Sequence, residues 1–430
     1  MSTAEGTIFA LATARGKSGV AIVRLSGEQS IAILERLGGP APPARMAQVR
    51  RLRDAHGVLL DEALVLRFER GASFTGEPVV ELHLHGSVAI VRAVLRAIEE
   101  TGLAREAGPG EFTRRALMAG RLDLLQVQGL RDLIDAETEG QRRHAMRVYS
   151  GDMADRVSGW RRSLLRAASL IEATIDFADE DVPVDVLPEV RALIGGVVSD
   201  LSKEVAGAGA AARLKSGFEV ALVGAPNVGK SSLLNRLARS EVAIVSDRPG
   251  TTRDVIEVRL DLGGVPVVFL DMAGLRDADD EIERLGVERA IRRAAEADIR
   301  IFLTEGDVAA GGGVARHDGD VQVRTKVDIY GGDGVSALTG EGIEALLHEV
   351  STTLGARVGA AGAISSDRDV ALFRDAGMIL DGVVARSGSG SSELMADDLR
   401  RAVAMLGAVV GEVGVEDVLG EIFATFCIGK

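Results

Sequence analysis

The amino-acid sequence predicts a multidomain protein. An N-terminal α+β domain is expected first, followed by an all-α helical domain that is discontinuous because an α/β domain is inserted into it. Three observations predict this class. The chain has 430 residues, which is too long for one ordinary domain. Helical apolar spacing fills two separate blocks, and the segment between them alternates apolar strands with helices. Apolar residues make up 46% of the chain, enough for several cores.

The first domain is predicted at residues 1–118. Strand-like segments alternate there with two helical segments, which is typical of an α+β domain. The expected strands are Thr7–Thr13, Gly19–Leu25, Ala63–Phe68 and Val79–His85, and the expected helices are Ser30–Leu37 and Ser87–Glu100.

The helical domain is predicted at residues 119–213 and 355–430, because apolar side chains recur there at helical spacing. An example is the series Leu164, Leu165, Ala168 and Ile171. Residues 214–354 interrupt this pattern with the strand–loop–helix order of a doubly wound α/β domain. The inserted domain is therefore expected at 214–354.

Residues 224–232 read Gly-Ala-Pro-Asn-Val-Gly-Lys-Ser-Ser and follow the apolar run Phe218–Val223. This pattern predicts a phosphate-binding loop, in which Lys230 reaches the β- and γ-phosphates and the Ser231 hydroxyl binds Mg²⁺. A plain glycine-rich turn is the alternative, but a strand and a helix flank the loop as nucleotide binding requires. The nucleotide-binding residues predicted here are Asn227, Val228, Gly229, Lys230, Ser231 and Ser232.

Two downstream segments fit the loops that sense a γ-phosphate. The first precedes a strand, and its threonines suit closure over Mg²⁺ and the γ-phosphate, with Thr252 as the Mg²⁺ ligand. Its predicted binding residues are Ser246, Asp247, Arg248, Pro249, Gly250, Thr251 and Thr252.

The second segment follows the apolar strand Val265–Leu270 and contains Asp271, Met272, Ala273 and Gly274. Asp271 is expected to support Mg²⁺, and the Gly274 N–H to contact the γ-phosphate. A bare loop and a strand-end turn are the alternatives.

Residues 325–328, Thr-Lys-Val-Asp, resemble the guanine-selecting pattern Asn-Lys-x-Asp. Asp328 would accept hydrogen bonds from the guanine N1–H and amino group, which adenine does not offer, and Lys326 would lie over the ring. Thr325 stands where asparagine is usual, which predicts a weaker tether. Ser336, Ala337 and Leu338 are expected to close over the base. The order and spacing of these motifs favour GTP over ATP.

Beyond these motifs, nearly the whole chain resembles the MnmE (TrmE) family of tRNA-modification GTPases. The resemblance rests on the segments Gly19–Gly27, Phe74–Glu77, Pro109–Ala116, Leu122–Leu124, Asp132–Ala136 and Phe426–Lys430. It implies a dimerising, tetrahydrofolate-binding N-terminal domain and a TrmE-type G domain. It also implies a homodimer that forms a heterotetramer with the FAD-dependent partner MnmG. The expected reaction adds a carboxymethylaminomethyl or aminomethyl group to C5 of wobble uridine 34 in certain tRNAs, using a folate one-carbon unit.

The resemblance further implies that GTP hydrolysis is activated when two G domains dimerise around K⁺. Asn227 matches the family's K⁺-ligating asparagine, and carbonyl groups of Ser246, Arg248 and Thr251 would complete the cation site. Glu283 matches the glutamate that orients the attacking water. On the sequence alone, an acid on a helix surface is the alternative for Glu283.

Glu81, His83 and His85 alternate along a strand and so share one face. They suit either a metal site or, more often, core and hydrogen-bonding positions. The resemblance instead assigns Glu81 to the pterin ring of a tetrahydrofolate, and no zinc is expected. Further contacts to this ligand are implied for Arg24, Arg121 and Lys430. Cys427 is either a small buried side chain or, by resemblance, a thiolate in the one-carbon chemistry.

A net charge of −14 argues against a general nucleic-acid binder, so a partner is expected to supply much of the tRNA-binding surface. A stripe of arginines offers either a tRNA-facing surface or an ordinary solvated helix face: Arg142, Arg143, Arg147, Arg161, Arg162 and Arg166. With no membrane-length apolar run, no signal-peptide pattern and a single cysteine, the protein is predicted to be cytoplasmic.

Two other functions remain open from the residues alone. One is a GTPase switch for ribosome assembly, which would act as a binding module. The other is a GTP-regulated, folate-dependent transferase that acts on small molecules.

Overall fold

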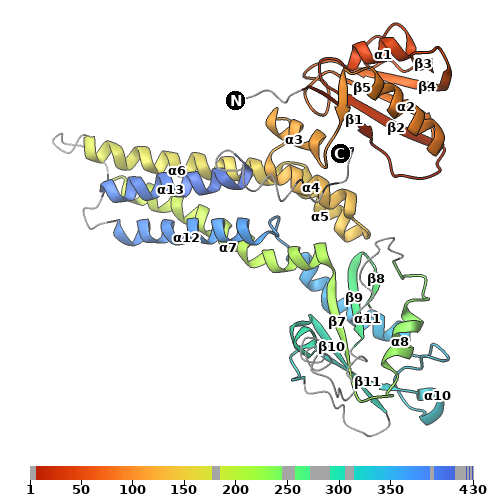
Figure 1. Cartoon of the computed structure of the whole chain (residues 1–430). Helices are drawn as coiled ribbons and strands as arrows, with labels where there is room; N and C mark the ends of the chain where they lie inside the picture. The colour runs from red at the N-terminus through yellow and green to blue at the C-terminus, as the bar shows by residue number, and fades with distance from the viewer. Residues whose placement is uncertain are drawn as a thin grey trace, which may run out of the picture. The chain divides into compact units, whose positions relative to one another are not determined.

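The computed structural model describes residues 6–176, 185–244, 257–271, 291–305, 314–387 and 392–411, together with Phe423, Phe426 and Gly429. Two compact units divide the chain, one within 1–131 and 407–430 and the other within 132–406 (Figure 1). None of the helices in the described ranges is long and apolar enough to cross a membrane. The predicted multidomain fold class is confirmed.

The N-terminal sheet has six strands in the order β3-β4-β5-β2-β1-β6. Neighbouring strands are antiparallel except β1 and β6, which are parallel. The strands are β1 (Thr7–Leu11), β2 (Val20–Ser26), β3 (Gln48–Arg53), β4 (Leu59–Phe68), β5 (Val79–His85) and β6 (Ala104–Glu106), and the helices are α1 (Ser30–Gly38) and α2 (Val88–Glu100). Strands β3 and β6 and the first residues of β4 were not predicted, because β3 is an edge strand rich in arginine and lacks a clear apolar pattern.

The two helices α1 and α2 cover one face of this sheet. Alternate strand residues such as Leu25 and Leu82 pack there against Ile33 and Ile98. The opposite face carries the other set of side chains, and cross-strand register places Arg24 beside Glu81 on it. The pleat of the sheet therefore separates an apolar core from a face with charged groups.

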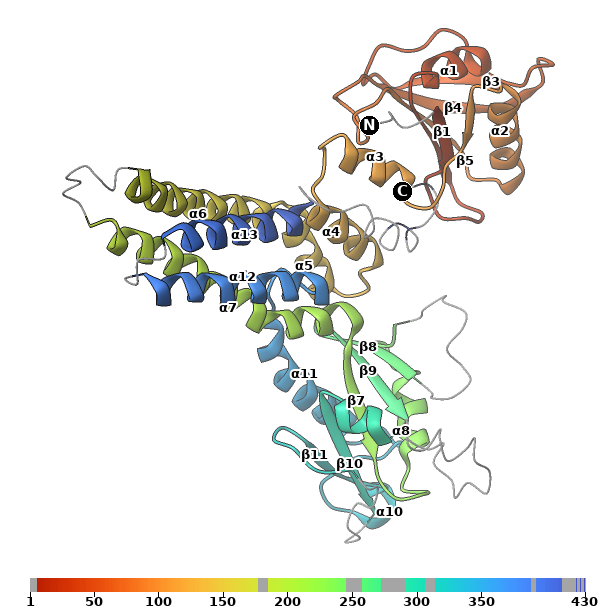
Figure 2. The same ribbon diagram turned by 60° about the vertical axis from the view of Figure 1, so that its left-hand side comes forward.

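The helical part of the chain comes from both sides of the inserted domain. Its helices are α4 (Leu124–Asp135), α5 (Glu139–Tyr149), α6 (Asp152–Asp176), α7 (Leu187–Ser216), α12 (Asp367–Arg386) and α13 (Ser392–Val410). The short helix α3 (Glu111–Met118) belongs instead to the N-terminal domain, where Phe112 packs against Ile8 and Ala10 of β1. Helices α6, α7, α12 and α13 lie side by side in both views (Figures 1 and 2). Trp160 of α6 meets Phe373 of α12 edge to face, with ring centroids 5.6 Å apart. Segments far apart in sequence thus share one helical core.

The inserted domain has a five-stranded sheet in the order β11-β10-β7-β9-β8. Strands β7, β9, β10 and β11 run parallel, and the edge strand β8 is antiparallel to β9. The elements are β7 (Phe218–Val223), α8 (Lys230–Leu237), β8 (Glu257–Leu262), β9 (Val265–Asp271), β10 (Ile299–Glu305), β11 (Val321–Thr325), α10 (Val327–Tyr330) and α11 (Ile343–Gly359). Helices α8 and α11 pack on the same face of the sheet (Figure 2). Ligands bind at the carboxyl ends of such parallel strands.

The start of α5 contacts the β8–β9 turn of the inserted domain through backbone groups. The Thr138 hydroxyl and the Gly140 N–H both donate hydrogen bonds to the Gly264 carbonyl, at 2.9 and 3.1 Å. Thr138 also caps α5 in a capping box with Gln141. A Cβ atom at Gly140 would overlap the Gly264 oxygen, so this approach requires glycine.

Replacing Gly140 with alanine is expected to lower the melting temperature, because the added methyl group displaces the Gly264 carbonyl and breaks the Gly140 hydrogen bond. Overpacking of this kind costs about 1–3 kcal/mol. Gly195→Ala is the matched control, since Gly195 lies in α7 and a Cβ there would meet nothing within 4 Å. Alanine's higher helix propensity should leave that variant as stable as the parent or up to ~1 kcal/mol more stable. Thermal unfolding followed by circular dichroism measures both variants, and equal melting temperatures would contradict the contact.

Candidate functional site

The phosphate-binding loop, residues 224–232, joins the end of β7 to α8. Asn227 and Gly229 adopt left-handed backbone angles, with φ of 63° and 108°, which turns the loop around the start of the helix. The Lys230 ammonium donates hydrogen bonds to the carbonyl oxygens of Gly224 and Ala225, at 2.7 and 2.9 Å. The ammonium therefore lies against the first residues of the same loop, which is consistent with the phosphate-binding role predicted for Lys230.

The predicted Mg²⁺-supporting carboxylate lies close to this lysine. Lys230 and Asp271 are 8% and 6% exposed. Burial lowers the pKa of Lys230, and the negative charge of Asp271 opposes that shift. A cation and an acid thus lie near each other at the ends of β7 and β9, where they form a polar centre at the carboxyl edge of the sheet.

Thr325, at the end of β11, connects a second loop to the phosphate-binding loop. Its side chain is almost completely buried, and its hydroxyl donates a hydrogen bond of 2.6 Å to the Val228 carbonyl. The same hydroxyl lies 3.2 Å from the Thr304 carbonyl. A threonine at this position thus supplies a direct hydrogen bond between the two loops.

Residues Lys326–Tyr330, named here the base turn, follow directly. Lys326 has a left-handed backbone (φ 58°, ψ 37°) and precedes the short helix α10. Asp328 is exposed in the first turn of that helix. Ser336 is fully buried and Leu338 is 79% exposed. A parallel bridge between Thr325 and Val335 places the 336–338 loop beside the base turn.

Some predicted site residues lie outside the described residues, and the structure does not test their roles. They are Ser246, Asp247, Arg248, Pro249, Gly250, Thr251, Thr252, Met272, Ala273, Gly274, Glu283, Cys427 and Lys430. The phosphate-binding loop, Asp271, Thr325 and the base turn all lie at or directly after the carboxyl ends of parallel strands.

On the N-terminal sheet, Arg24 and Glu81 form an ion pair, with Nε–H donating to Oε1 at 2.9 Å. His83 Nε2 lies 3.4 Å from the other Glu81 oxygen. His85 does not join them: its Nδ1 lies 2.7 Å from Asp61 Oδ1, and its side chain is 70% exposed. Within the described ranges, no group of three or more His, Cys, Asp or Glu residues is placed to hold a metal ion.

Elements from the motif segments border this ion pair. The Arg24 guanidinium lies 5.8 Å from the centre of the Phe112 ring of α3. Arg121 passes the loop that contains Gly76, where a Cβ would be 3.5 Å from Arg121 Cγ. Arg24 and Glu81 are therefore adjacent, whereas the contact found for Arg121 is with the loop that contains Gly76.

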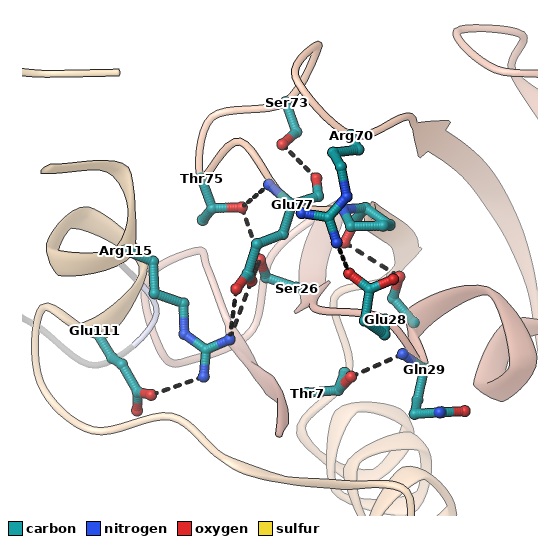
Figure 3. Close-up of polar contacts among 12 residues, drawn as sticks. Thr7, Ser26, Glu28, Gln29, Arg70, Ser73, Thr75, Glu77, Glu111 and Arg115 are labelled. Atoms are coloured by element: carbon teal, nitrogen blue, oxygen red, sulfur yellow. Dashed lines mark hydrogen bonds and ion pairs between the residues drawn. The ribbon is translucent and has the colours of Figure 1, made fainter. Parts of the chain in front are cut away.

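A buried network that sequence reasoning missed holds these motif segments together (Figure 3). Arg115 Nη1 donates to both carboxylate oxygens of Glu77, at 3.1 and 3.0 Å, and Ser26 Oγ donates to Glu77 at 2.6 Å. Arg115 Nη2 also donates to Glu111 at 3.0 Å. Burial raises the pKa of Glu111, but hydrogen bonds from Arg105, the Gly108 N–H and Arg115 outweigh it and lower the pKa to about 2.

The arginine stripe is largely occupied by local contacts. Arg142 and Arg143 pair with Glu139, each at 2.7 Å. Arg147 donates to the Ala361 carbonyl at 2.8 Å. Arg166 pairs with Glu189 at 3.2 Å, an exposed ion pair. These contacts favour the solvated helix face over a dedicated tRNA surface.

Comparison with known proteins identifies two family profiles along the chain. The profile described as "GTP-binding protein TrmE N-terminus" matches residues 7–121, and the profile "MnmE helical domain" matches residues 124–427. A solved structure of Era in complex with MgGDPNP and nucleotides 1506–1542 of 16S ribosomal RNA aligns with 32% of this chain and 56% of its own. Its identity is 25% and its TM-score 0.25, too low to add to the assignment.

Full-length relatives are much more similar. The tRNA modification GTPase MnmE of Cereibacter sphaeroides is 54% identical over 428 residues, which cover 99% of this chain and 100% of the relative. Proteins of the same name from Jannaschia sp. and Paracoccus denitrificans are 52% and 47% identical, with the same coverage. Both profiles and the full-length relatives agree, and the chain belongs to the MnmE (TrmE) family of tRNA modification GTPases.

Proposed function

We propose that this protein hydrolyses GTP and couples that cycle to modification of C5 of wobble uridine 34 in certain tRNAs. The observation that carries the proposal is the joined nucleotide site. Lys230 and Asp271 both lie at the carboxyl edge of the sheet, where the charge of Asp271 acts on Lys230. Thr325 attaches the base turn to the phosphate-binding loop. Membership of the MnmE family supports tRNA as the substrate, and a cytoplasmic location is proposed together with this reaction.

Different residues of the chain would bind the phosphates and the base of GTP. The loop amides and Lys230 bind the phosphates, while Asp328 accepts hydrogen bonds from the guanine N1–H and amino group. Leu338, which is largely exposed, and its neighbours Ser336 and Ala337 would cover the base. Because one loop binds the phosphates and another binds the base, the site would select a nucleotide by both parts.

Two cations fit the donor groups. Ser231 at the start of α8 and the buried carboxylate of Asp271 are hard oxygen donors of the kind that Mg²⁺ prefers, and Thr252 is proposed with them. The amide of Asn227 is exposed on the left-handed part of the loop. It is proposed as a K⁺ ligand, with carbonyl groups of Ser246, Arg248 and Thr251. Such cations neutralise charge that develops on the phosphates, and Glu283 is proposed to orient the attacking water.

The N-terminal sheet is proposed to bind a tetrahydrofolate through Glu81, Arg24, Arg121 and Lys430. The partly buried carboxylate of Glu81 suits the N–H edge of a pterin, because it accepts two hydrogen bonds. A Cβ at Gly429 would overlap the Leu11 carbonyl, so Gly429 lies against the end of β1. Cys427, two residues before it in the sequence, is proposed to act in the one-carbon chemistry.

A homodimer, joined by the FAD-dependent partner MnmG in a heterotetramer, is proposed as the working assembly. Large apolar side chains are exposed on β3, β4 and the segments beside them: Met46, Val49, Val58, Leu59 and Leu64. Val49 and Leu64 are direct cross-strand neighbours. An exposed apolar cluster of this kind marks an association surface and supports dimerisation through the N-terminal domain.

Cells that lack this protein are expected to lose the carboxymethylaminomethyl or aminomethyl group from wobble uridine. Mass spectrometry of tRNA nucleosides measures this loss. The wild-type gene should restore the modification and Lys230→Ala should not, because the phosphates lose their ammonium partner. Lys203→Ala, which removes an exposed lysine of α7, is the matched control and should restore it fully. Unchanged tRNA in the deletion strain would contradict the proposal and favour a ribosome-assembly switch or a small-molecule transferase.

Asn227→Ala is expected to abolish the stimulation of GTP hydrolysis by K⁺ over Na⁺, because the amide oxygen is removed from the proposed cation site. Rates are compared in KCl and NaCl of equal concentration. Asn235→Ala, on the following helix and away from the loop turn, is the control and should keep the stimulation. If Asn227→Ala is still stimulated by K⁺ as strongly as the wild type, the assignment of Asn227 is wrong.

A further inference from the structure

Glu305, the last residue of β10, contacts both ends of the base turn. Its Oε2 atom lies 2.8 Å from the Lys326 ammonium. Its Oε1 atom accepts a hydrogen bond of 2.8 Å from the Tyr330 hydroxyl. Register between β10 and β11 places Glu305 directly beside Thr325. One carboxylate therefore spans the turn that carries Asp328.

The base turn has few internal interactions that stabilise its conformation. Its helix α10 has only four residues, and a helix of that length is unstable without outside contacts. Lys326 has the left-handed backbone that residues other than glycine rarely adopt. Internal hydrogen bonds run from the Ile329 and Tyr330 N–H groups to the Lys326 carbonyl, at 2.9 and 3.1 Å. Contacts from outside the turn are therefore needed to fix its shape.

Glu305 provides such contacts without being part of the core. The Glu305 and Lys326 side chains are 33% and 32% exposed, and an ion pair this accessible to water contributes little to overall stability. Hydrogen bonds from Lys326 and Tyr330 lower the pKa of Glu305, so the carboxylate is ionised at neutral pH. The same hydrogen bond raises the pKa of Tyr330, which keeps its hydroxyl protonated as a donor. The consequence is local: the carboxylate fixes where the lysine stem and the tyrosine lie.

We propose that Glu305 and Tyr330 are positioning residues for guanine recognition, which set the residence time of the nucleotide by holding Lys326 and Asp328 in the base-binding arrangement. The proposal rests on the proposed function, because it assigns the base to this turn. A turn that is already ordered binds more tightly, since the cost of ordering it is not subtracted from the binding energy. Neither residue needs to touch the base.

The test measures dissociation of a fluorescent GDP analogue by stopped flow. Glu305→Gln keeps the shape of the side chain but removes its charge, and it should accelerate dissociation about 5- to 10-fold. Tyr330→Phe removes one hydrogen bond and should accelerate it about 2- to 5-fold. Because both act on one turn, the double variant should fall short of the product of the two effects. Asp333→Asn, an exposed acid in the next loop, is the matched control and should dissociate like the wild type.

A second readout separates positioning from a general structural role. For Glu305→Gln, the KM for GTP should rise while kcat at saturating GTP stays within about twofold, and the melting temperature of the free protein should stay unchanged. Dissociation at the wild-type rate, or acceleration that is matched by a lower melting temperature, would overturn the inference. Failure of the wild-type protein to bind the GDP analogue would instead overturn the proposed function.

Discussion

The buried hydroxyl of Thr325 is the interaction on which the nucleotide site depends. It links two loops that are 97 residues apart in the sequence, through one hydrogen bond of 2.6 Å to the Val228 carbonyl. The Val228 side chain is itself part of the core, so the bond attaches the base turn to a fixed point. The proposed function assigns phosphate recognition to one of these loops and base recognition to the other, and a nucleotide bridges both only when their separation is constant. Glu305 then sets the shape of the turn that Thr325 anchors.

Hydrogen bonds to backbone groups also join the inserted domain to the helical bundle. The β8–β9 turn is bound at Gly264 by the start of α5, and the segment after α11 is bound by Arg147 and Glu204. Strand β9 runs from that turn to Asp271 beside Lys230. The proposed nucleotide site therefore has a direct structural connection to the helices, through one strand and the turn that precedes it.

Local patterns predicted the parts of the fold and site whose residues are close in sequence. The phosphate-binding loop was predicted because spacing alone defines it, and β5 because its apolar residues alternate. Contacts between distant residues were not predictable in this way. Arg115 and Glu77 are 38 residues apart, and Glu305 lies 21 and 25 residues from its two partners. No periodicity joins such residues; only the tertiary fold brings them together, since Arg115 and Tyr330 lie in helices and Glu77 precedes a strand. The adjacency of Arg24 and Glu81 likewise follows from pairing of β2 with β5.

The most direct test of this account is the affinity for GDP after Thr325→Val, measured by titration calorimetry. Valine keeps the buried volume but removes the hydroxyl and leaves the Val228 carbonyl without its donor, at a cost of about 1–3 kcal/mol. The account predicts a Kd about 5- to 100-fold higher than that of the wild type, whereas Thr325→Ser, which retains the hydroxyl, should bind within a few-fold of the wild type. A Thr325→Val variant that binds GDP as tightly as the wild type would contradict the central role of this hydrogen bond.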